Sequence, residues 1–180
     1  MTSDIHETPS VNRRDWLLLL SLGNFKIILV AFYMLSIVTI LKQSGFTLNQ
    51  LSIFYLLGFT ELTQIAISLV IQRYQVNHRK GHFRYWLLLS NIVIFLALLS
   101  LFWIDITTQF SWLMLCCFTL SIMGNFLAGA TLGLNSTILN YRERGMGGVI
   151  SVISARSGRM IGGGLVLYLY QYWGWHAAVG

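Results

Sequence analysis

The chain is organised as long apolar runs separated by short polar links. A transmembrane helix needs roughly 20 predominantly apolar residues, and five runs reach that length. They cover Trp16–Leu41, Leu51–Ile71, Tyr85–Ile104, Phe110–Leu132 and Gly145–Tyr170, and a further run begins at Trp175. The pattern predicts an all-α integral membrane protein with a polar tail over residues 1–15, five complete spans and the start of a sixth that is cut short.

The first run could also belong to a signal peptide, because a polar lead and two arginines precede it. The run is longer than a signal peptide's apolar region, and no A-x-A cleavage motif ends it. We therefore favour a retained first span.

Basic residues are concentrated in every second link. Eight of them lie on one side of the predicted spans: Arg13, Arg14, Arg73, Arg79, Lys80, Arg84, Arg142 and Arg144. The links on the other side carry only Lys42. Because Lys and Arg are enriched in cytoplasmic loops, this asymmetry predicts a multi-pass protein with a cytoplasmic N-terminus. We expect the inner (plasma) membrane as its location.

Composition agrees with a membrane protein, since 56% of residues are hydrophobic, 10% are charged and the mean hydropathy is +0.67. About a quarter of the residues in an ordinary soluble domain are charged. Most of the basic residues behind the net charge of +6 lie in the links between apolar runs, so we expect the lipid bilayer and not nucleic acid as a partner. Cys116 and Cys117 are adjacent in an apolar run, without metal-ligand spacing, and are interpreted as packing residues. No catalytic or cofactor motif is present, so we expect no enzyme, cofactor or metal site.

Four charged residues lie inside the predicted spans: Lys26, Glu61, Arg156 and Arg159. At a rise of about 1.5 Å per residue, they share roughly one depth. A charge in hydrocarbon costs at least about 2.5 kcal/mol, so these residues need partners or water. Glu61 offsets one cation and leaves two in excess, which favours a cavity for a small anionic solute. The alternative is that the charges only pair with one another or extend toward the interface.

Two stretches carry a resemblance to a known family. One is "ILKQSGFTLNQLSIFYLLGF", residues 40–59. The other is "RERGMGGVISVISARSGRMIGGGLVLYLYQYWGW", residues 142–175, with Arg156-x-Gly158 followed by the triplet Gly162–Gly164. With the short links and the basic loop, they make the chain resemble the N-terminal six-helix half of a major facilitator superfamily transporter. Within that superfamily, they are similar to the AmpG-type muropeptide permeases and the RhtX/FptX-type siderophore permeases.

The resemblance implies residue roles. It implies that Arg156 faces the anion and that Arg73, Arg79 and Lys80 belong to a loop that acts in conformational change. Arg159 stands where the family usually has an apolar residue, so we expect it to pair with Glu61. The glycines in "GRMIGGG" are expected mainly to allow close helix packing, with a hinge as the alternative, on the face that carries the arginines.

The leading functional hypothesis is a truncated transporter that imports an anionic solute such as a ferric siderophore across the inner membrane. The alternatives are a muropeptide permease and a non-transporting membrane interaction protein or inactive fragment. Substrate sites of such folds lie between two halves, so we expect a missing C-terminal half or a second membrane subunit as partner.

Overall fold

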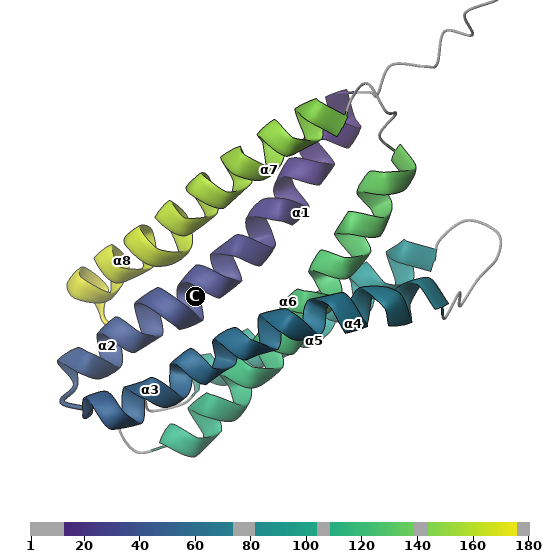
Figure 1. The fold of residues 1–180 in the computed structure, drawn as a ribbon. Helices are drawn as coiled ribbons and strands as arrows, with labels where there is room; N and C mark the ends of the chain where they lie inside the picture. Colours follow the sequence, from purple (N-terminus) through teal and green to yellow (C-terminus); the bar gives the residue numbers. More distant parts are fainter. Residues whose placement is uncertain (1–12, 74–81, 104–108, 139–143, 176–180) are drawn as a thin grey trace, which may run out of the picture.

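A computed structural model of the chain describes residues 13–73, 82–103, 109–138 and 144–175. Helices form almost all of this part, and it contains no β-strand (Figure 1). The prediction of an all-α architecture is therefore confirmed for the described residues. The predicted sixth span continues into residues 176–180, which lie outside them.

The first helical segment runs without a break through a π-helical turn. It consists of α1 (Arg13–Ala31), the π-helix η1 (Phe32–Ile37) and α2 (Val38–Gln43). A short turn follows, in which Gly45 adopts φ +90° and its N–H donates to the Lys42 carbonyl at 3.2 Å. Residues with a Cβ rarely adopt this positive φ, so Gly45 fixes the sharp reversal of the chain after α2.

The remaining segments are also long helices with local irregularities. The second consists of α3 (Leu48–Leu56), the 3-10 turn η2 (Leu57–Phe59) and α4 (Thr60–Arg73). The third and fourth are α5 (His82–Phe102) and α6 (Phe110–Ile138). The fifth consists of α7 (Arg144–Arg159), the π-helix η4 (Met160–Leu165) and α8 (Val166–Trp173).

Within the described residues, four segments are long and apolar enough to cross a membrane: Arg13–Gln43, Leu48–Ile71, Phe83–Phe102 and Phe110–Asn135. They overlap the first four predicted spans. The fifth predicted span, residues 145–170, lies on α7–η4–α8, which is helical throughout but is not among the four. Its glycines, serines and two arginines make it less apolar than the other segments.

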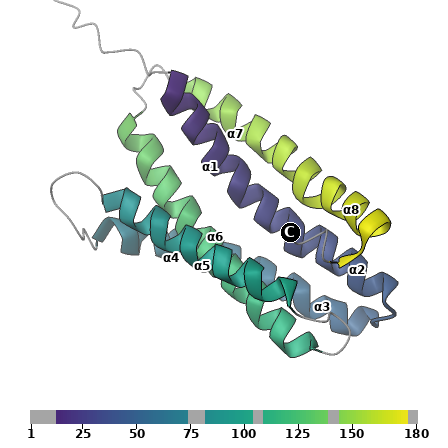
Figure 2. The ribbon, with the colours of Figure 1, turned by 180° about the vertical axis from the view of Figure 1, so that it is seen from behind.

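Helices α1 and α6 contact each other, and each of them also packs against further helices. The segment α7–η4–α8 runs beside α1–η1–α2 in both views, and α6 contacts α1, α4 and α5 (Figures 1 and 2). Span one is therefore flanked by the fifth segment on one side and by α6 on another. This arrangement brings the N-terminal half of α1 close to the C-terminal half of α6 and the start of α7.

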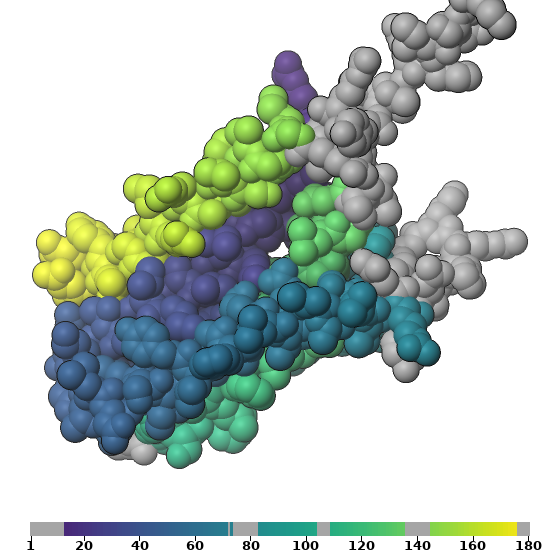
Figure 3. Space-filling view, viewed as in Figure 1, coloured from purple at the N-terminus to yellow at the C-terminus, as the bar shows by residue number. Residues whose placement is uncertain are grey.

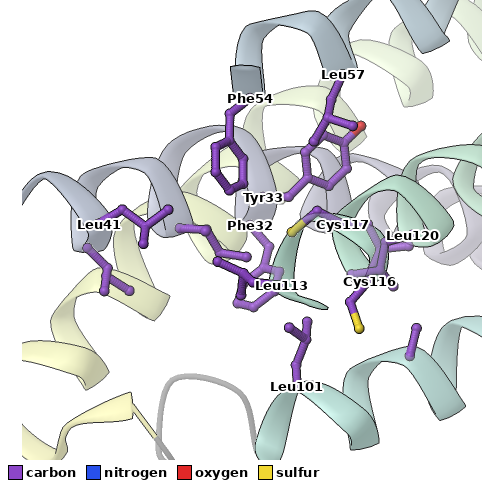
Figure 4. Packing of buried hydrophobic residues seen from close by; sticks show 14 of the residues in the cluster. Phe32, Tyr33, Leu41, Phe54, Leu57, Leu101, Leu113, Cys116, Cys117 and Leu120 are labelled. Carbon is purple, nitrogen blue, oxygen red and sulfur yellow. The ribbon is translucent and has the colours of Figure 1, made fainter. Parts of the chain in front are cut away.

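The core lies where η1, α2, α3 and η2 meet α5 and α6. Phe32, Tyr33, Phe54 and Leu113 pack there with other buried side chains (Figure 4). Cys116 and Cys117 belong to the same cluster, are 4% and 0% exposed, and are both free thiols. Their interpretation as packing residues is confirmed.

Small residues allow α7 and η4 to lie directly against α1. Ser154, Gly158, Gly162 and Gly163 are buried in this contact. A Cβ added at Gly162 would lie 2.3 Å from the Ile28 carbonyl oxygen, so only glycine fits there. Close packing, as expected for these glycines, is confirmed. The expectation that they share the face of Arg156 and Arg159 is wrong, because both arginines are exposed while these glycines are buried.

The two π-helical turns lie against each other at this interface. The Ser36 hydroxyl, in η1, donates to the carbonyl oxygens of Gly162 and Gly163 in η4 at 2.8 and 3.2 Å. A π turn disturbs the regular pairing of backbone carbonyls with N–H groups in an α-helix. A side-chain hydroxyl can donate to a carbonyl oxygen that is left without an N–H partner. Ser36 therefore stabilises the irregular turn of the neighbouring helix.

Candidate functional site

A cavity of about 260 Å³ lies between the first, second, fourth and fifth helical segments. Its polar lining groups are Lys26 from α1, Gln64 from α4, Thr131 and Asn135 from α6, and Ser151 and Ser154 from α7. Figure 3 shows the molecule hollowed between α1 and the second half of α6. The wall thus combines apolar surface with a few polar groups, as is typical of small-molecule sites.

Lys26 and Gln64 mark the inner end of this cavity. The residues of α1 that line it run from Trp16, near the helix start, to Lys26 and Ile27. Lys26 follows Trp16 by ten positions, which corresponds to about 15 Å along the helix. The helix ends beside the cavity are those flanked by the basic links. Under the predicted topology, the cavity therefore opens toward the cytoplasm.

Lys26 and Glu61 form an ion pair in this region. The Lys26 ammonium donates to Glu61 Oε2 at 2.9 Å and to Gln64 Oε1, also at 2.9 Å. The two charged side chains are 16% and 34% exposed, respectively. Partial burial strengthens the attraction between them relative to a surface pair, which contributes little. The two candidates from spans one and two are therefore brought together.

A chain of hydroxyl groups continues from Glu61 into the core. The Tyr33 hydroxyl donates to Glu61 Oε1 at 3.4 Å and lies 3.2 Å from Ser121 Oγ. Ser121 Oγ in turn forms a very short contact with Thr60 Oγ1. Asn125 Nδ2 donates to the Thr60 carbonyl at 2.6 Å. The Glu61 carboxylate is thus held from the core side as well as by Lys26.

The uncharged members of this network were not predicted from the sequence as site residues: Tyr33, Thr60, Gln64, Ser121 and Asn125. A signal was available for two of them, because Gln64 and Asn125 lie inside predicted spans, where a polar side chain without a partner is costly. Asn125 is fully buried, and its Oδ1 has no hydrogen-bond partner among the described residues. The hydroxyl residues gave no such signal, since Ser and Thr commonly bond to their own helix.

Arg156 and Arg159 are separate from the Lys26–Glu61 pair. Both are exposed on α7, near the exposed apolar side chains of Val152, Ile153 and Met160. Among the residues that the structure describes, neither forms a hydrogen bond or an ion pair. The expected pair of Arg159 with Glu61 is therefore wrong, because Glu61 contacts Lys26 instead. Of the four candidate charges, Lys26 and Glu61 therefore form one pair, and Arg156 and Arg159 form an exposed basic patch on α7.

The structure describes only part of the candidate conformational loop. Arg73 is the last residue of α4 and is exposed. Arg79 and Lys80 lie outside the described residues. The role expected for this loop stays a prediction.

Similarity searches relate the chain to a permease. Over 132 residues it is 26% identical to the anhydromuropeptide permease of Escherichia coli K12, and equally to that of Escherichia coli O157:H7. The match covers 71% of this chain and 26% of each relative, so the matched part is about a quarter of the relatives' length. No family model matches the chain. Together with the apolar helices, the match identifies a multi-pass membrane protein related to a permease.

Proposed function

We propose that this chain forms one wall of a permease for an anionic solute, with the cavity at Lys26 receiving the charged end of that solute. The observation that carries the proposal is the placement of a partly buried ammonium at the inner end of a cavity between membrane helices. An ionisable group inside a membrane segment commonly marks a solute pathway. The similarity to permeases supports the same conclusion.

A muropeptide fits these observations better than a ferric siderophore. The matched relatives are named anhydromuropeptide permeases. A muropeptide carries peptide carboxylates, which suit Lys26, and sugar hydroxyls and amides, which suit Gln64, Thr131, Asn135 and the serines of α7. The siderophore hypothesis rests on sequence resemblance, whereas both relatives named above are muropeptide permeases.

The size of the cavity indicates that it holds only part of such a solute. Small-molecule sites usually enclose about 300–1,000 Å³, whereas this cavity has about 260 Å³. We propose that further membrane helices, from a second half or a second subunit, provide the opposite wall. Arg156 and Arg159 support this proposal, because two exposed cations near apolar side chains on one helix need a polar or anionic surface against them.

For the architecture, we propose the N-terminal half of a major facilitator fold in the inner membrane, with a cytoplasmic N-terminus. The five helical segments of the described residues and the resemblance of residues 40–59 and 142–175 support this proposal. The concentration of basic residues at the links beside the cavity supports it as well.

Binding of solute to the purified protein tests this function. The protein is expressed from its own gene, together with any coding sequence that continues in the same reading frame. We expect saturable binding of labelled anhydromuropeptide, competition by unlabelled muropeptide and none by a neutral disaccharide. Lys26→Gln should abolish binding, whereas Lys42→Gln is the matched control because Lys42 is exposed and does not line the cavity. Equal binding by both variants, or displacement by ferric siderophore alone, would contradict the muropeptide proposal.

A further inference from the structure

Lys26 contacts both the cavity and the buried polar network. An ammonium group has three N–H donors. Two of them serve Glu61 and Gln64, and among the described residues no acceptor takes the third. Lys26 and Gln64 line the cavity, but Glu61 does not. A solute in the cavity therefore meets an ammonium whose charge is already offset by a carboxylate outside the lining.

Glu61 has hydrogen-bond support that does not depend on Lys26. Its Oε1 accepts from Tyr33, whose side chain is 1% exposed and is itself in contact with Ser121. Tyr33 lies in the π-helical turn η1, and Ser121 lies in α6. The carboxylate is consequently anchored from the core and would keep a donor if it lost Lys26.

We propose that Glu61 is a built-in competitor for the solute at Lys26. Without solute, the ion pair neutralises the ammonium and the cavity has little attraction for simple anions. A carboxylate of the solute takes the place of Glu61 on Lys26, while Tyr33 retains Glu61. Two carboxylates close to one ammonium repel each other, so the solute must compensate with further contacts, such as those to Gln64 and the hydroxyls of the wall. Glu61 thereby selects for solutes that combine a carboxylate with several hydrogen-bonding groups. This inference rests on the proposed function of the cavity.

Glu61→Gln is the sharpest test, because glutamine keeps the shape and removes the negative charge. Its one acceptor oxygen can face Lys26 while its NH2 group donates to the Tyr33 hydroxyl. We expect labelled anhydromuropeptide to bind about 10- to 100-fold more tightly, as is usual for a freed charge-assisted hydrogen bond. Acetate, which has a carboxylate without the other groups, should change from no detectable competition to competition. Asp105→Asn is the charge-matched control, because it removes one negative charge from the link after α5. This variant should bind muropeptide with the affinity of the parent.

Glu61→Asp guards against a folding defect in the glutamine variant. It keeps the charge but shortens the side chain, which weakens its contact with Lys26, so muropeptide affinity should lie between those of the parent and Glu61→Gln. If both Glu61 variants bind with the affinity of the parent while Lys26→Gln abolishes binding, the competitor role is overturned and the proposed function stands. If neither the parent nor any variant binds muropeptide, the proposed function fails, and this inference fails with it.

Discussion

The contact between Gly162 and α1 allows a stability prediction with a control on the same helix. In Gly162→Ala, the added Cβ would lie 2.3 Å from the carbonyl oxygen and 2.9 Å from the Cα of Ile28. Both are backbone atoms, which cannot rotate away. Since ordinary contact begins at 3.4 Å, the fifth segment must move away from α1 by about 1 Å, a shift of the kind that overpacking imposes.

The cost follows from what this shift disturbs. Overpacking of a well-packed contact costs about 1–3 kcal/mol. The hydrogen bond from Ser36 to the Gly162 carbonyl, 2.8 Å long, would exceed bonding distance, and its loss adds about 1 kcal/mol. We expect a total of about 2–4 kcal/mol, which lowers Tm by about 4–16 °C for a chain of this size.

Gly164→Ala is the matched control, because no atom lies within 4 Å of a Cβ at this exposed position. Alanine is favoured over glycine inside a helix by about 0.5–1 kcal/mol, so its Tm should equal or slightly exceed that of the parent. Both variants can be compared by thermal unfolding in detergent, monitored through tryptophan fluorescence at one heating rate. Equal Tm values for the two variants would refute the close approach of η4 to α1.

Three further predictions concern the network and the topology. Lys26→Met should lower the free energy of unfolding by about 1–3 kcal/mol, which is less than for a fully buried pair because Glu61 is 34% exposed. Adding Glu61→Leu should recover most of this loss, and additive effects in the double-mutant cycle would argue against coupling. Ser36→Ala should lower the stability by about 1 kcal/mol through loss of its bonds to η4, and an unchanged Tm would contradict that role. A reporter fused after Gly81 should be cytoplasmic and one fused after Thr107 external; the reverse result would overturn the topology.

Sequence reasoning identified the charged residues of the site but not how they pair. Helical rise predicts a similar depth for Lys26, Glu61 and Arg159 along their helices, yet depth does not reveal which helices are neighbours. In the structure, α7 lies against α1 with its small residues, and this contact turns Arg159 outward while Lys26 meets Glu61. Tertiary packing thus determines whether Lys26 or Arg159 pairs with Glu61.

The π-helical turn η1 was also beyond reach of the sequence pattern. An extra residue per turn shifts the phase of an amphipathic stripe, but a helix that is apolar on most sides has no stripe in which the shift could be seen. The short reversal after α2 could be anticipated, because Gly45 lies between two long apolar runs. Elements marked by a contrast in polarity were therefore predictable, and those inside uniformly apolar sequence were not.

The burial of both thiols makes the native chain a ready background for chemical labelling. Cys116 and Cys117 are the only cysteines of the sequence, and their side chains are enclosed in the core. Buried cysteines are inert toward polar reagents, which need an accessible thiolate. Single cysteines placed along the cavity wall can thus be modified by maleimides without first replacing the native pair. Protection of such probes by added muropeptide would show which residues of the cavity wall contact the proposed solute.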